Sequence, residues 1–144
     1  MSESIWTGEI TTKILNDLNK NTLGEFFDIE FIEVGNDFLK AKMPVQNKSK
    51  QPFGLLHGGA SVALAETIGS VASWCVVNRE LFMGVGVEIN ASHVRSVTEG
   101  NVTAICTPIK ISGKTLLWEI KILDDNNQLC CICRFTAMVV PLRK

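Results

Sequence analysis

One charged side chain, Glu66, interrupts a long apolar segment of the sequence. Between Lys50 and Arg79 no other Asp, Glu, Lys or Arg occurs. The segment predicts a helix from Gly58 to about residue 77 whose apolar side chains surround its axis, and such a helix is buried. A carboxylate moved from water into an apolar interior costs several kcal/mol. We therefore expect a buried Glu66, either satisfied by hydrogen bonds or a distant lysine, or facing a cavity as base or nucleophile.

The start of the same helix, His57-Gly58-Gly59, offers backbone N–H groups to a ligand. The first turn of a helix carries unpaired amides and about half a positive charge, and glycine lets a ligand atom approach them closely. An oxygen that gains negative charge fits this place, and one such donor is worth about 2.7–4 kcal/mol in a transition state. His57 caps the helix, orients the ligand or only packs, and the pattern leaves these roles open.

The spacing of these two groups predicts a site shared between two chains. Eight residues separate Gly58 from Glu66, which corresponds to about 12 Å of helix rise. A base or nucleophile acts on an atom within about 3 Å. We therefore expect Glu66 of one chain to face Gly58 of a second chain in a homodimer.

The remaining elements predict an α+β fold. Residues 9–20 carry apolar side chains at helical spacing, as in a short amphipathic helix. After Gly24, alternating residues predict strands at 27–31 and 38–43, joined by a turn at 35–37. Four further strands are expected at about 83–93, 100–111, 114–123 and 128–140. Short connections predict antiparallel neighbours, and thus a curved antiparallel sheet wrapped around one long buried helix.

Composition predicts one globular domain spanning residues 1–144, with no general attraction to polyanions. The chain is 46% hydrophobic and 20% charged, with a formal net charge of -1, so nucleic acid and membranes are not expected partners. No secretory signal is visible at the N-terminus. The five cysteines are odd in number, which is typical of reduced thiols in a cytoplasmic protein. Cys130, Cys131 and Cys133 lack the four-ligand spacing of a zinc site.

The run from Gln51 to Ser73, QPFGLLHGGASVALAETIGSVAS, resembles the signature of hotdog-fold thioesterases. Residues 86–96 (GVEINASHVRS) and 129–134 (LCCICR) are also similar to these enzymes. More narrowly, the likeness is to the branch that hydrolyses 1,4-dihydroxy-2-naphthoyl-CoA in menaquinone synthesis, with its siblings acting on aryl thioesters and 4-hydroxybenzoyl-CoA. It covers nearly the whole chain from about Gly24 and implies a hotdog fold and hydrolysis of an acyl-CoA.

The resemblance also implies the catalytic residues. Glu66 is the catalytic carboxylate, and the backbone N–H of Gly58 polarises the thioester carbonyl. Gln51 and His57 help to position the carbonyl and the attacking water. Ser70, one helical turn after Glu66, contacts the water or the carboxylate.

Further residues are implied to bind the two ends of the substrate. Phe53 and Thr67 belong to the acyl site together with Val71, which stands where close relatives often carry a larger methionine. The smaller valine leaves more room for the acyl group. The nucleotide end of coenzyme A is implied to lie against His93, Arg95, Ser96 and Lys114, where charged and hydroxyl groups suit phosphates. For each base the alternative is an ordinary solvated surface charge.

The resemblance implies hydrolysis without a metal or redox cofactor, an acyl-CoA as binding partner, and a homo-oligomer that is a dimer or a dimer of dimers. Glu66 either deprotonates water or attacks the carbonyl to form a mixed anhydride, and the sequence leaves both routes open. One alternative is a broad-range or medium-chain aliphatic acyl-CoA thioesterase. A hotdog enoyl hydratase or dehydratase is disfavoured because no Asp-x4-His pattern occurs. A non-catalytic acyl-CoA-binding module is the third alternative.

Overall fold

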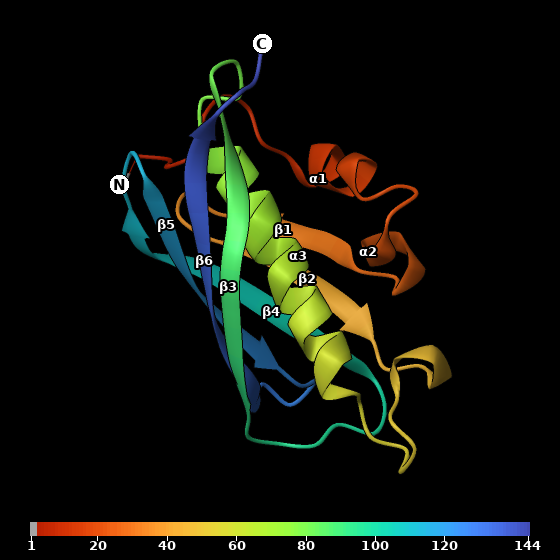
Figure 1. Ribbon diagram of the computed structural model, residues 1–144. Coiled ribbons are helices and arrows are strands. Elements are labelled where there is room, and N and C mark those ends of the chain that lie inside the picture. The colour runs from red at the N-terminus through yellow and green to blue at the C-terminus, as the bar shows by residue number, and fades with distance from the viewer. Residues whose placement is uncertain (1–2) are drawn as a thin grey trace.

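A long helix lies against one face of a curved antiparallel sheet in the computed structural model, which describes residues 3–144 (Figure 1). The strands are β1 (Glu30–Val34), β2 (Leu39–Pro44), β3 (Phe82–His93), β4 (Asn101–Ile111), β5 (Thr115–Leu123) and β6 (Leu129–Pro141). The helices are α1 (Thr12–Leu18), α2 (Leu23–Phe26), the 3-10 turn η1 (Asn47–Ser49) and α3 (Gly58–Val76). Helix α3 contacts every strand from β2 to β6, so the predicted α+β arrangement is confirmed.

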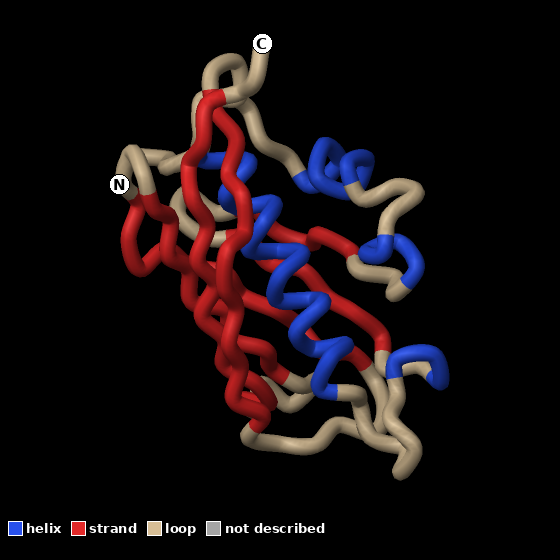
Figure 2. The backbone as a smooth tube through the Cα atoms, viewed as in Figure 1, coloured by secondary structure: helices blue, strands red, loops and turns tan. Residues whose placement is uncertain are grey.

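The order of the strands leaves β3 at one edge of the sheet. In space the order is β1-β2-β4-β5-β6-β3, and all neighbours are antiparallel. The four later strands match their predicted bounds to within one or two residues. However, β3 pairs with β6 and not with its sequence neighbour β4, because the loop at residues 94–100 carries the chain past β6 and β5 to the place of β4 between β2 and β5 (Figure 2). One edge of β3 therefore keeps unpaired backbone groups.

The N-terminal segment differs from its predicted form. Helix α1 is shorter than the expected 9–20, because Thr11 caps it by accepting a hydrogen bond from the N–H of Ile14 at 3.2 Å. The expected strand at 27–31 begins only at Glu30, and a second short helix, α2, precedes it. Thr22 caps α2 through its side chain, so two threonine caps break the segment into two helices.

The inner face of α3 packs closely on the sheet. A Cβ atom at Gly69 would lie 2.6 Å from Cδ1 of Phe135 on β6, so only glycine allows this approach. The fully buried Ser73 accepts a hydrogen bond from Nε1 of Trp118 at 2.9 Å and donates one to the Gly69 carbonyl at 2.9 Å. Within residues 3–144, α3 alone has the length and composition of a candidate membrane span, and half of it is buried in this fold.

Candidate active site

The first turn of α3 leaves one backbone amide free. His57 is the N-cap, and its Nδ1 accepts a hydrogen bond from the N–H of Gly59 at 2.7 Å. The N–H groups of Ala60 and Ser61 donate to the His57 carbonyl at 2.9 and 3.2 Å. Among the described residues no acceptor faces the N–H of Gly58. This amide is therefore the donor that a ligand oxygen can use.

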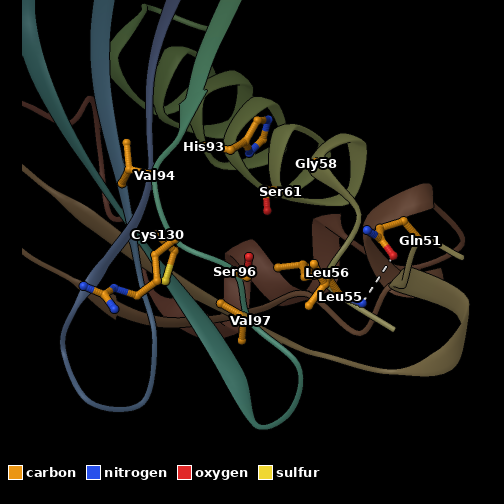
Figure 3. Close-up of a pocket in the computed structure, with 11 residues that line it drawn as sticks. Gln51, Leu55, Leu56, Gly58, Ser61, His93, Val94, Ser96, Val97 and Cys130 are labelled. Atoms are coloured by element: carbon orange, nitrogen blue, oxygen red, sulfur yellow. Dashed lines mark hydrogen bonds between the residues drawn. The ribbon is translucent and has the colours of Figure 1, made fainter. Parts of the chain in front are cut away.

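A cavity of about 420 Å³ opens at this helix start (Figure 3). Its lining combines three segments: Gln51, Leu55, Leu56, Gly58, Ser61, His93, Val94, Arg95, Ser96, Val97 and Cys130. The Oε1 atom of Gln51 accepts hydrogen bonds from the N–H groups of Phe53 and Leu55, which orients the Gln51 side chain. The imidazole of His93 lies so close that a Cβ at Gly58 would be 3.0 Å from its Nε2. The cavity thus gathers Gln51, His93 and the free amide.

Glu66 is exposed on the chain, so the expectation that it is buried is wrong. The error lies in the helix: α3 is not covered on all sides, and Glu66 and Ser70 face away from its buried stripe. Within residues 3–144, no ion pair or side-chain hydrogen bond holds the carboxylate. Its Oε1 lies 3.9 Å from the position that a Cβ on Gly86 would occupy. The carboxylate is therefore unpaired and lies over the middle of strand β3.

Glu66 lines a second cavity, also of about 420 Å³, between α3 and the α1–α2 segment. The lining residues are Leu18, Asn19, Thr22, Leu23, Gly24, Ala63, Glu66, Thr67, Ser70 and Val71. None of them lines the cavity at the helix start. One chain therefore holds the carboxylate and the free amide of Gly58 in separate cavities.

The comparisons with known proteins agree with one another. Residues 53–131 match the family model described as Thioesterase superfamily. The chain belongs to this superfamily. The 1,4-dihydroxy-2-naphthoyl-CoA hydrolase of Escherichia coli (strain K12) is 46% identical over 136 residues, which cover 94% of this chain and 99% of that protein. The proofreading thioesterase EntH of Cronobacter turicensis is 43% identical, covering 94% and 98%.

Solved structures show the same fold for this thioesterase. The crystal structure of a glutamine-to-alanine variant of a Pseudomonas aeruginosa thioesterase superposes with a TM-score of 0.95 at 41% identity. The match covers 96% of this chain and 100% of that one. The predicted hotdog fold and the predicted thioester hydrolase activity are both confirmed.

The thioesterase brings most of the predicted residues to one of these two cavities, with three exceptions. His57 caps α3 and lines neither cavity. Phe53 is 87% exposed and lines neither cavity. Lys114 accepts a backbone hydrogen bond from Val139 near the end of β6, whereas the helix-start cavity lies near Cys130 at the beginning of that strand. Within one chain, neither Phe53 nor Lys114 reaches the site expected for it.

Several lining residues were not predicted from the sequence. Ser61 lines the cavity at the helix start, and Leu18 and Leu23 line the same cavity as Glu66. Leu18 has the apolar spacing of the predicted amphipathic helix, but its side chain is 46% exposed. Nothing in the spacing of residues 18–24 signals their approach to α3, because the two segments are distant in sequence.

The cysteines pack inside the thioesterase fold. All five are free and buried. The Sγ atoms of Cys131 and Cys133 lie 3.6 Å apart, as expected for side chains on the same face of a strand. Among residues 3–144, no group of three or more His, Cys, Asp or Glu side chains is arranged to hold a metal ion.

Proposed function

We propose that this thioesterase hydrolyses an aromatic or bicyclic acyl-CoA, such as 1,4-dihydroxy-2-naphthoyl-CoA, to the free acid and CoA. The observation that carries the proposal is the unpaired Glu66 carboxylate on the wall of a cavity of about 420 Å³. Ligand pockets measure about 300–1,000 Å³, so this one suits an acyl group alone. The hydroxyls of Thr67 and Ser70 have no partner among the described residues and are free for ring substituents. The name of the Escherichia coli relative supports the same substrate class.

The free amide and the carboxylate divide the chemistry between them. The N–H of Gly58 donates a hydrogen bond to the thioester carbonyl oxygen, where negative charge develops. In the base route, Glu66 takes a proton from water, the water oxygen bonds to the carbonyl carbon, and the C–S bond breaks. The departing thiolate of CoA then receives the proton. In the anhydride route, a Glu66 oxygen bonds to the carbonyl carbon and the C–S bond breaks, so that the CoA thiolate leaves. Water then cleaves the anhydride to the free acid and the Glu66 carboxylate, and the proton released from water goes to the thiolate.

The cavity at the helix start suits the coenzyme A end of the substrate. Arg95 is its one formally charged lining residue, and His93 and Ser96 add further polar groups beside it. A guanidinium binds phosphate oxygens in a bidentate manner. Lys114 lies toward the other end of the sheet and would have to come from another subunit to join this site.

The two cavities belong to one active site in a dimer that pairs two copies of β3. The free edge of this strand offers unpaired backbone groups and the exposed side chain of Val87. Along β3, Glu66 lies beside Gly86, and Gly58 lies beside His93. A two-fold axis that passes midway between Gly86 and His93, close to Ile89, brings Glu66 of one subunit opposite Gly58 of the other subunit. The predicted separation of the two groups supports this arrangement.

A second apolar surface supports a dimer of dimers. Gly84 and Gly86 face α3, so Met83 and Val85 point to the outer face of the sheet. Val85 pairs with Met138 on β6, and all three apolar side chains are exposed. Contiguous exposed apolar patches mark interaction surfaces. Light scattering on a Val85→Lys, Met138→Lys variant should show a dimer where the unaltered protein is a tetramer.

Thiol release from a panel of acyl-CoAs tests the proposed function. We expect kcat/KM for benzoyl-CoA and naphthoyl-CoA to exceed that for hexanoyl-CoA and decanoyl-CoA. A strong aliphatic preference would replace the aromatic assignment with the broad-range or medium-chain alternative. Hydration of an enoyl-CoA without thiol release would instead favour the hydratase.

Replacing the carboxylate tests the mechanism. Glu66→Gln should lower kcat by several orders of magnitude with a modest change in KM, because it removes the base or nucleophile and keeps the shape. Glu9→Gln, an exposed carboxylate that lines neither cavity, is the matched control and should stay near the unaltered rate. Near-normal turnover by Glu66→Gln would remove Glu66 from the mechanism. Oxygen-18 incorporated into Glu66 in a single turnover would support the anhydride route, and its absence the water route.

A further inference from the structure

The cavity beside Glu66 has a wall that lies outside the family match. Five of its ten lining residues come from α3, and the other five are Leu18, Asn19, Thr22, Leu23 and Gly24. The match to the thioesterase superfamily covers residues 53–131, so the α1–α2 segment is not part of it. Half of the lining is thus supplied by a segment outside the residues that the superfamily model matches.

We propose that the α1–α2 segment sets the size of the acyl group that the enzyme accepts, and that Leu18 and Leu23 are its specificity-determining side chains. The inference rests on the proposed function, in which the acyl group occupies the cavity beside Glu66. The segment forms the wall opposite α3, so it bounds the acyl group on the side away from the reacting carbonyl.

Hydrogen bonds hold this wall in place. The Asn16 side chain donates to the carbonyl of Phe31 at 3.0 Å and accepts from its N–H at 2.8 Å. Nδ2 of the buried Asn19 donates to the carbonyl of Ile29 at 2.8 Å. Gly24 lies against the Asn19 side chain, where a Cβ would collide with it. These contacts tie the segment to the sheet, and a fixed wall can discriminate between acyl groups by size.

The wall and the helix differ in chemistry. Leu15 of the same segment is fully buried. Leu18 and Leu23, in contrast, are 46% and 57% exposed and line the cavity. The α3 side carries the Glu66 carboxylate and two hydroxyl groups. The reacting end of an acyl group therefore lies toward α3, and its apolar far end toward the two leucines. In an apolar pocket, one methylene of misfit changes kcat/KM by about 10–200-fold.

Two substitutions at Leu23 change the cavity in opposite directions. Leu23→Trp narrows it, and we expect the ratio of kcat/KM for naphthoyl-CoA to that for benzoyl-CoA to fall about tenfold or more. Leu23→Ala widens it and should raise the same ratio. Leu23 is more than half exposed, so both variants should fold. The matched control is Phe26→Ala, an exposed residue of the same helix that does not line the cavity, and its ratio should stay within about twofold.

The outcomes separate this inference from the proposed function. A ratio unchanged within about twofold in both Leu23 variants, with the unaltered enzyme active, would overturn the inference alone. No thiol release from any acyl-CoA by the unaltered enzyme would overturn the proposed function as well. A changed ratio that accompanies dissociation of the oligomer in light scattering would show that Leu23 contacts a partner chain, which also overturns the inference.

Discussion

Two inactive variants of this thioesterase should recover activity when their subunits exchange. Glu66→Ala removes the carboxylate from the acyl cavity, and Gln51→Ala alters the cavity at the helix start. Each variant alone carries its defect in both sites of a homodimer. In the mixed form of the proposed dimer, one site combines the two defects and the other is intact, because in that arrangement each site takes Glu66 from one chain and Gln51 from the other.

The size of the recovery follows from the geometry. About 12 Å of helix rise separates Gly58 from Glu66, compared with a reach of about 3 Å for a catalytic group. Equal mixing gives about half mixed dimers, each with one intact site of two, so activity should rise to about one quarter of the unaltered value. A chromogenic thiol reagent reports released CoA with little background, since all five cysteines are buried.

A second mixture controls for subunit exchange itself. Glu66→Ala and Ser70→Ala alter the same cavity of the same chain, so their mixed dimers contain no intact site and should show no gain. Native mass spectrometry confirms that mixed dimers have formed. If the first mixture then shows only the mean activity of its two parents, each site lies within one chain and the two-fold arrangement is wrong.

Three further predictions concern the packing of α3. Gly69→Ala should destabilise the fold by about 1–3 kcal/mol in urea unfolding, because its Cβ would press on Phe135 at 2.6 Å; an unchanged midpoint would show that the helix shifts freely. Ser73→Ala should also cost about 1–3 kcal/mol, since the buried Nε1–H of Trp118 loses its acceptor; equal stability would mean that another acceptor replaces it. Burial raises the pKa of Cys75 to about 12. Iodoacetamide should therefore alkylate Cys75 slowly in the folded protein and quickly in urea, as followed by mass spectrometry. Fast labelling before unfolding would show that the end of α3 opens.

The strands could be predicted from the sequence because their side chains alternate. Strand β5 alternates buried and half-buried positions along most of its length, and such a pattern fixes an element and its bounds. The neighbours of β3 could not be predicted in this way. Its position beside β6 depends on a loop that crosses the sheet, and alternation carries no information about which strands pair.

The chemistry of the site was more predictable than its surroundings. Residue types alone singled out Gly58 and Glu66 as candidates, and the eight-residue spacing predicted their separation, which agrees with their two distinct cavities. The contribution of α1 and α2 was missed, because it arises from tertiary contacts between segments far apart in the chain. Two threonine caps and two asparagine side chains decide where that segment lies.

The exposure of Glu66 has a physical explanation in the rest of its helix face. The chain covers only part of the side chains of Val62, Ala63, Thr67 and Val71. A helix face that stays in water carries mainly polar side chains, so this largely apolar face indicates a further contact. In the proposed assembly, the substrate fills the cavity beside Glu66 and a second subunit pairs with the free edge of β3, and together they cover this face. In that proposed assembly, the second subunit and the bound acyl group complete the low-dielectric surroundings that strengthen a catalytic carboxylate. A helix whose sequence is apolar on all sides thus indicates that most of its surface is buried. It does not indicate whether the same chain or another chain buries it.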